Sequence, residues 1–362
     1  MSVFGEKRAA FALGVASLIM GFPMFFDAGL IVMLPVIFAV GRRIGGKHML
    51  LYGISAAAAF SVMHVFVPPH PGPITASETY GANLGLVLVI GLVVALPTWY
   101  LTGYLWAKFT DKRIPLAIVD LFGGRDVDPV NPPKAGTVIG VLAIPLVLIL
   151  LNTGISALVS AGVVEGSLVW VQALRLIGTS QIALLISVLI ALFVLGTRRG
   201  VHGTALEKIV DSALGPICSV VLITGAGGMF GGVLRASGIG SALSDSLSSL
   251  GIPVIFAAYL IAVVLRVAQG SATVALVTAA GLVSPAVLAA DFSPLQVACV
   301  VLATAAGSVF AGHVNDSGFW LVGRLMGMDV KTTLKTWTVQ QALESVVGFA
   351  FVLVIFGAVS LV

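Results

Sequence analysis

The residues best suited to chemistry lie near the end of the chain, between Ala305 and Trp320, in the sequence AAGSVFAGHVNDSGFW. An apolar run breaks there into Gly, His, Asn and Asp. Within a membrane, an unwound segment is tolerated only where it is buried in protein or lines a water-filled cavity, because its free backbone groups need partners. His313, Asn315 and Asp316 are therefore candidates for a substrate or ion site. The alternative is a short polar loop between helices.

Three other apolar runs are broken in a comparable way. The breaks are GFPMFFDAG at 21–29, HVFVPPHPGP at 64–73 and RVAQGSAT at 266–273. A helix that restarts within Gly270–Thr273 would aim free N–H groups and its positive dipole end at an anion such as a carboxylate. The competing interpretation is that these small residues only allow close packing of helices.

Arg266 lies in an otherwise apolar run, where an ionisable side chain indicates function by default. Three interpretations are open. Arg266 could bind the carboxylate of a substrate, it could pair with Asp316 or Asp27 in a structural role, or it could extend from a helix end to the membrane interface.

Composition identifies the class of protein. The 362 residues are 59% hydrophobic and 9% charged, whereas soluble domains have roughly 25% charged residues. Apolar runs of about 18 residues or more recur, each able to span about 30 Å of hydrocarbon as a helix. We therefore predict an all-α, polytopic integral membrane protein with about ten apolar helical segments, some broken or re-entrant. They cover residues 9–22, 28–40, 50–67, 84–105, 137–160, 170–195, 214–234, 251–266, 272–290, 295–311 and 339–361.

Other classes of function have little support. The net charge of +4 comes from basic residues that act mainly as topology signals, so no nucleic-acid partner is predicted. Cys218 and Cys299 lie in apolar segments without a CxxC spacing, and neither a disulfide nor a metal site is expected. No P-loop, HExxH or GxSxG motif stands in a plausible context, so we predict neither an enzyme nor a cofactor.

The chain is expected to form one transmembrane domain, residues 1–362, with two related halves. Laying Phe4 onward over Leu250 onward aligns the break at 23–27 with that at 269–273, and brings the His70 stretch against the His313 stretch. Such inverted repeats with broken helices are typical of transporters. The predicted parts are a first half at 1–105, a cytoplasmic loop at 106–136, connecting helices and a loop at 137–212, and a second half at 213–362. The Gly-rich segment 224–247 has no counterpart before the first half, which indicates that this half is incomplete at its N-terminus.

The ordered motifs resemble a known family. They are GFPMFFDAGLIVMLPVIF, SVMHVFVPPHPGP, RVAQGSATVALVTAAG and GHVNDSGFWLV, followed by KTTLKTWTVQQALESVVGF. The chain resembles the gluconate permease family of gluconate:proton symporters over essentially its whole length. The resemblance implies a multi-pass carrier in the bacterial inner membrane, with gluconate or a similar small organic anion, protons and the lipid bilayer as its partners. Members have a further N-terminal region that this chain lacks, which leaves open whether it transports by itself.

A sugar acid offers one carboxylate and several hydroxyls, and proton coupling needs a group that changes charge. Ser271 and Thr273 offer hydroxyls for the polyol, and histidines are suited to proton transfer by an intrinsic pKa of about 6.5. For His70, flanked by prolines, a structural role is equally plausible. The predicted substrate-binding residues are Arg266, Gly270, Ser271, Thr273, His313, Asn315, His64 and His70. The predicted proton-coupling residues are Asp27, Asp316 and His313.

Several alternatives remain open. The substrate could be another small carboxylate or amino acid such as lactate or D-serine, and the coupling ion could be Na⁺. A different class of function is a truncated membrane protein that binds a ligand without transporting it. Assembly as a homo-oligomer is compatible with the sequence, which does not decide it.

Overall fold

The computed structural model describes residues 8–43, 48–117, 133–160, 163–212 and 251–361, together with residues 214, 229, 233 and 237. Within these ranges the regular structure is helical, and six helices are long and apolar enough to cross a membrane. The predicted all-α, polytopic membrane fold is thereby confirmed. The chain divides into two compact units. The first contains Met1–Ala82, Val87–Asp126 and Thr224–Val362, and the second contains Asn83–Leu86 and Val127–Ile223.

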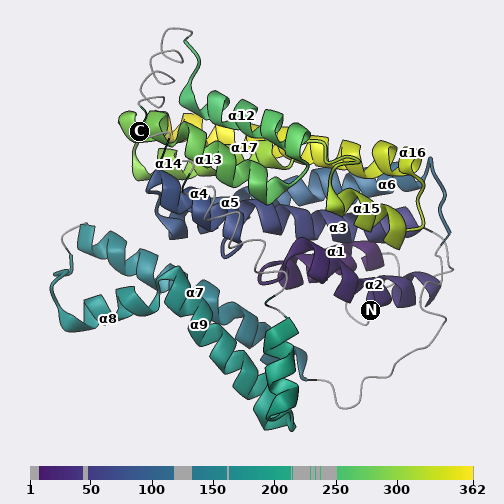
Figure 1. The fold of residues 1–362 in the computed structure, drawn as a ribbon, viewed down its shortest axis with the longest axis horizontal. Coiled ribbons are helices and arrows are strands. Elements are labelled where there is room, and N and C mark those ends of the chain that lie inside the picture. The colour runs from purple at the N-terminus through teal and green to yellow at the C-terminus, as the bar shows by residue number, and fades with distance from the viewer. Residues whose placement is uncertain are drawn as a thin grey trace. The chain divides into compact units, whose positions relative to one another are not determined.

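Apart from the first three residues of α5, the first unit contains two runs of helices with the same order of elements (Figure 1). The first run is α1 (Ala9–Gly21), α2 (Phe26–Arg43), α3 (Met49–Phe66), α4 (Pro71–Tyr80) and a long helix made of α5 (Leu84–Thr98), η2 (Trp99–Leu105) and α6 (Trp106–Asp111). The second run is α12 (Val254–Gln269), α13 (Ala272–Ala289), α14 (Pro294–Ser308), α15 (Ser317–Leu325) and a long helix made of α16 (Val330–Thr333), η5 (Leu334–Thr338) and α17 (Val339–Ser360). Both long helices include a π-helical segment, η2 and η5.

The starts of corresponding helices are regularly spaced. In the first run α2, α4 and α5 begin at residues 26, 71 and 84, and in the second α13, α15 and α16 begin at 272, 317 and 330, in each case 246 positions later. Laying Phe4 over Leu250 gives the same offset. The correspondence supports the division into two repeats, whose inverted orientation stays a prediction.

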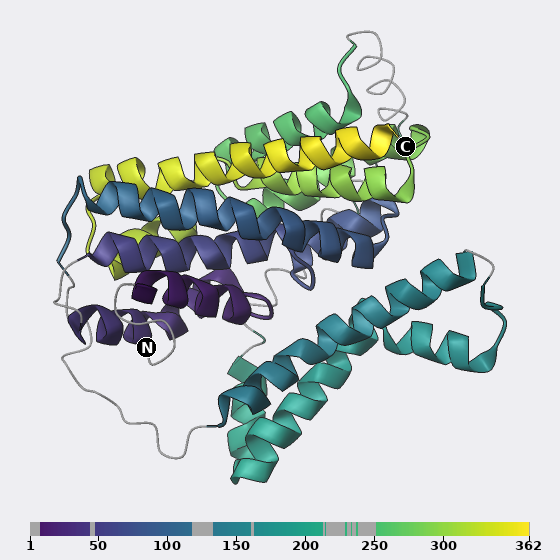
Figure 2. The ribbon, with the colours of Figure 1, turned by 180° about the vertical axis from the view of Figure 1, so that it is seen from behind.

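Two central helices account for much of the interior. In α3 every residue from Tyr52 to Met63 is buried, and in α14 every residue from Ala298 to Ser308. A helix that is apolar on all sides is expected at the centre of a bundle. α3 is contacted by α1, α2 and η2, and α14 by α12, α13 and α17. Figure 2 shows α17, in yellow, alongside the blue helix of α5, η2 and α6. The Trp106 indole N–H donates to the main-chain oxygen of Thr336 at 3.0 Å.

Two features differ from the prediction. The region around Pro71 was expected to connect two spans, but it forms the helix α4, because proline is tolerated in a first helical turn. The single span expected at 170–195 is two helices, α8 (Val169–Ile177) and α9 (Ser180–Ala191), which pack on α7 (Ala135–Ser160) in the second unit. At the break between them, a Cβ on Gly178 would collide with the Leu148 carbonyl and the Asn152 side chain.

The second unit also has the short segments η3 (Leu192–Gly196) and η4 (Thr197–Arg199), and residues 204–212 are helical. Several predictions fall on residues that the structure does not describe. These are Cys218, almost all of the Gly-rich segment 224–247 and of the span 214–234, and residues 118–132 of the expected cytoplasmic loop.

Candidate functional site

The break between α12 and α13 meets the loop between α14 and α15 through a buried ion pair. Arg266, near the end of α12, donates from Nη2 to Oδ2 of Asp316 at 2.6 Å, and both side chains are almost fully buried. Asp316 also begins α15, because its Oδ1 accepts from the Gly318 N–H at 3.0 Å. The pair with Asp316, which the sequence left open as one interpretation of Arg266, is present in the structure.

Gly270 ends α12 and allows the two segments to approach each other. Its φ of +82° lies in the left-handed region that favours glycine. Its carbonyl accepts a hydrogen bond from Arg266 Nη1, and a Cβ added at this position would collide with the main chain of Asn315. Ser271 then caps α13, and its hydroxyl accepts from the Val274 N–H at 3.4 Å. A helix therefore restarts within the GSAT sequence, as predicted.

The loop between α14 and α15 is held on two sides. The Asn315 amide Nδ2 donates to the Val267 oxygen in the last turn of α12 at 2.9 Å. The Thr338 hydroxyl, at the end of η5, donates to the Gly312 main-chain oxygen at 2.6 Å. This unwound segment is thus tied to protein on both sides, as a break at membrane depth requires.

A chain of three hydrogen bonds joins the other two breaks to α13. His70 Nε2 lies 2.8 Å from the Gly21 oxygen, His64 and His70 are 3.3 Å apart between their Nδ1 atoms, and His64 Nε2 lies 3.2 Å from Thr273 Oγ1. Because a carbonyl can only accept, His70 must donate from Nε2, and its Nδ1 then accepts in the neutral ring. His64 therefore donates from Nδ1 and accepts the Thr273 hydroxyl at Nε2.

Protonation of His64 would change this arrangement in a defined way. Protonation of His64 at Nε2 would turn that nitrogen into a donor, so the Thr273 hydroxyl would have to reverse and accept. Thr273 belongs to the first turn of α13, three residues after Gly270, whose carbonyl accepts from Arg266. The histidine pair and the helix start can therefore influence each other through one hydroxyl group.

Two predicted residues make fewer contacts. Asp27 lies in the first turn of α2, one residue after the break, and is exposed, although the negative charge of Asp316 acts on it. His313 is half-buried, and its Nδ1 is buried with no hydrogen-bond partner among the described residues. The structure thus brings eight of the ten predicted residues into one connected arrangement, and leaves Asp27 and His313 beside it.

Glu344, an acidic residue near the start of α17, was not among the residues predicted from the sequence. Its side chain is fully buried, with hydrogen bonds to Ser61 of α3 and to Gln340 and Gln341 of its own helix. The signal was present in the sequence, because Glu344 is an ionisable residue within a predicted span.

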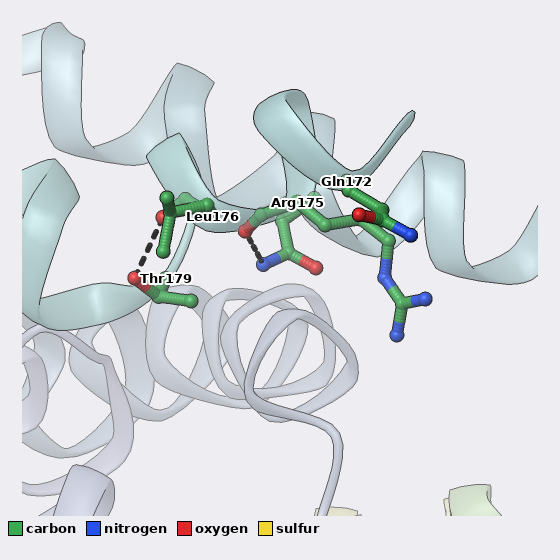
Figure 3. Close-up of a pocket in the computed structure, with 5 residues that line it drawn as sticks. Gln172, Arg175, Leu176 and Thr179 are labelled. Atoms are coloured by element: carbon green, nitrogen blue, oxygen red, sulfur yellow. Dashed lines mark hydrogen bonds between the residues drawn. The ribbon is translucent and has the colours of Figure 1, made fainter. Parts of the chain in front are cut away.

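The second unit has a pocket of about 310 Å³ where α8 ends (Figure 3). Its lining residues are Asn152, Gln172, Arg175, Leu176 and Thr179. Two polar groups of the pocket already hydrogen-bond to main-chain oxygens at the end of α8. The Asn152 amide donates to the Arg175 oxygen and the Thr179 hydroxyl donates to the Leu176 oxygen, both at 2.7 Å. We therefore interpret this pocket as a structural consequence of the break between α8 and α9.

Comparison with known proteins yields a consistent set of relatives. The family model for GntP family permeases matches residues 1–359. The inner membrane permease YgbN of Escherichia coli strain K12 is 36% identical over 357 residues, covering 95% of this chain and 77% of that protein. The gluconate permease of Bacillus subtilis is 36% identical over 359 residues, 97% of this chain and 79% of the relative. The Gnt-II system L-idonate transporter of E. coli K12 is 35% identical over 359 residues, covering 98% of this chain and 79% of that protein.

Proposed function

The chain belongs to the GntP permease family, and we propose that it imports gluconate or a related sugar acid together with protons. As a family member it is a multi-pass transporter of the bacterial inner membrane, and not an enzyme. Relatives named for gluconate and L-idonate support a sugar-acid substrate. The observation that carries the proposal is the meeting of broken helices around Arg266 and the start of α13.

The substrate carboxylate would bind between Arg266 and the first turn of α13. The positive end of this 18-residue helix favours an anion, and the guanidinium adds a full charge. Arg266 Nε is buried and has no hydrogen-bond partner among the described residues. The Nε–H of Arg266 therefore stays available while Nη1 binds Gly270 and Nη2 binds Asp316.

The hydroxyl groups of the sugar acid would contact short polar side chains around the same point. Ser271 and Thr273 flank the start of α13, and His64 is linked to Thr273. Asn315 and His313 approach from the loop between α14 and α15, where His313 Nδ1 is buried without a partner in the described structure. We assign substrate binding to these residues together with Arg266, Gly270 and His70.

Charge balance supports proton coupling. Among the described residues, Arg266 is the one buried Lys or Arg side chain, and Asp316 already neutralises it. An anion that enters this region therefore adds an uncompensated negative charge, which is costly away from water. A proton that binds at the same time removes the cost. We retain His313, Asp27 and Asp316 as predicted proton-coupling groups.

Alternating access would follow from movement of one group of broken helices against the other, as in other carriers with two repeats. The ion pair between Arg266 and Asp316 connects α12 to the loop before α15, so it lies where such a movement would act. A substrate carboxylate that competes for Arg266 would weaken this connection. Substrate binding and helix movement would thereby be coupled.

The test of the proposed substrate is a competition panel in vesicles that contain the protein. Unlabelled gluconate and L-idonate are expected to inhibit the uptake of labelled gluconate, while lactate and D-serine have little effect. Stronger inhibition by lactate or D-serine would overturn the sugar-acid assignment. Uptake that requires sodium and does not respond to a proton gradient would overturn the assignment of the ion.

A further inference from the structure

Glu344 is a fully buried carboxyl group at membrane depth, and its partners are all uncharged. The Ser61 hydroxyl donates to Oε1 at 2.9 Å, and the Gln340 amide donates to Oε2 at 2.9 Å. No Lys or Arg side chain forms an ion pair with Glu344 in the part of the chain that the structure describes. An ionised carboxylate without a countercharge is expensive in such a place, so the neutral acid is favoured.

The surrounding amides can accommodate both protonation states. Gln341 Nε2 lies within hydrogen-bond distance of Ser61 Oγ, Gln340 Oε1 and Glu344 Oε2, at 2.9, 3.0 and 3.2 Å. An amide has only two hydrogens for these three acceptors, so the network has more than one arrangement. Each of these groups can also offer an oxygen to a protonated carboxyl. The network therefore tolerates a proton that arrives and leaves.

Glu344 is connected to the proposed substrate site through two helices. Ser61 and His64 are three residues apart on α3 and share one face of that helix. The Tyr259 hydroxyl of α12 lies 3.0 Å from the Ser345 hydroxyl, and Arg266 is two turns further along α12. The charge of Arg266 acts on both Glu344 and His64.

The elements packed on α17 add few other titratable groups. Arg266 and Tyr259 belong to α12, and Tyr52 and His64 belong to α3. α14 contributes Cys299, η2 contributes Tyr100 and Tyr104, and η5 contributes Lys335. Tyr100 stacks on Tyr104, and Lys335 is exposed. Among these neighbours Arg266 is the one buried cation, and it is paired with Asp316.

We propose that Glu344 binds the proton that is transported with the anion, a refinement that rests on the proposed symport function. The carboxyl group holds a proton while the anion is bound, so that the negative charges of the anion and Asp316 are not joined by a third from Glu344. It releases the proton after the anion has left. Ionised Glu344 repels the substrate, and this repulsion couples the two fluxes.

The test separates coupling from substrate movement. Glu344→Gln keeps the size and the hydrogen-bonding capacity of the side chain but cannot release a proton. In vesicles it is expected to lose accumulation of labelled gluconate driven by a proton gradient, while it retains counterflow exchange, which needs no net proton movement. Gradient-driven accumulation at the wild-type level would overturn the proposal. The control is Glu165→Gln, the same change on an exposed residue, which is expected to leave both activities intact.

If Glu344→Gln fails to insert into the membrane, a second variant tests whether Glu344 binds the transported proton. Ser61→Ala removes a hydroxyl that stabilises the ionised carboxylate, so the pH dependence of uptake is expected to move to higher pH. An unmoved pH dependence would contradict the proposal. Failure of the proposed function itself looks different, because the wild-type protein would then show neither gradient-driven uptake nor counterflow of gluconate.

Discussion

The main-chain oxygens of Gly21 and Val267, which lie 246 positions apart in the chain, each accept a hydrogen bond from a side chain of a later loop. Gly21 is the last residue of α1 and accepts from His70 Nε2 at 2.8 Å, whereas Val267 in the last turn of α12 accepts from Asn315 Nδ2 at 2.9 Å. In each run a side chain from the loop before a short helix binds the end of the first helix. The two runs of helices thus each have a side-chain hydrogen bond to the end of the first helix.

Replacement of His70 by Ala tests this contact. The Gly21 oxygen would lose its side-chain donor, and an unsatisfied buried acceptor costs about 1–3 kcal/mol. Asn315→Ala is expected to have a smaller effect in the second run, because the hydrogen bond to the Val267 oxygen is exposed. Thermal unfolding of the purified protein in detergent measures both, with His202→Ala as a control because that histidine is exposed. An unfolding temperature for His70→Ala equal to that of the control would contradict the contact.

The ion pair between Arg266 and Asp316 is expected to show strong coupling. Removal of one partner leaves the other charge buried and unpaired, at a cost of about 3–5 kcal/mol. Asp316→Asn and Arg266→Met should therefore each be destabilising, and the two changes together less so than their sum. The measurement is a double-mutant cycle of thermal unfolding. Additive losses would show that the two side chains do not form a stabilising pair.

Transport by the same variants distinguishes Asp316 from Glu344. Asp316→Asn disturbs the partner of Arg266, so we expect it to reduce counterflow and gradient-driven uptake together. Measurement of both activities in one vesicle preparation gives the comparison. Loss of gradient-driven uptake alone, with counterflow preserved, would instead assign the coupled proton to Asp316.

Ser271 and Thr273 are expected to contribute to affinity more than to stability. Their joint replacement by Ala removes two hydroxyl groups at the start of α13 while the helix remains apolar and well packed. The apparent affinity for gluconate should fall by about tenfold or more, on the scale of about 1.4 kcal/mol for each tenfold. Thr278→Ala on the same helix is the matched control. Wild-type affinity in the double variant would reject this part of the site.

Gly270 can be compared with another glycine of similar backbone conformation. Both Gly270 and Gly200 have φ near the left-handed region, at +82° and +87°. A Cβ on Gly200 has no atom within 4 Å, whereas one on Gly270 would collide with Asn315. Gly200→Ala should cost only the backbone strain, about 1 kcal/mol, and Gly270→Ala should cost more and reduce transport. Equal unfolding temperatures would show that the close approach is unimportant.

Much of the architecture could be predicted because the breaks are visible in the sequence. Gly, Pro and Asp interrupt apolar runs at the positions where α1, α12 and α14 end. The helix α4 was missed because PGPITASETY is polar and rich in proline. Its burial depends on distant partners, such as the hydrogen bond at 3.0 Å between the hydroxyls of Tyr80 and Thr304.

The candidate site was predicted in composition but not in pairing. The partner of Arg266 lies 50 residues away, and no local pattern distinguishes Asp316 from Asp27. The link from His64 to Thr273 joins residues 209 positions apart, so it depends on how the helices pack. Glu344 was visible as a charged residue in a span, yet its importance emerges only from its burial beside Ser61.

The central claim, that the protein couples sugar-acid import to protons, is tested most directly by uptake of labelled gluconate into vesicles that contain only this 362-residue chain. An imposed inward proton gradient is compared with the same vesicles after the gradient is collapsed. We predict accumulation above the external concentration with the gradient and simple equilibration without it. Uptake that is absent, or unchanged by the gradient, from protein shown to be folded and inserted would contradict the account.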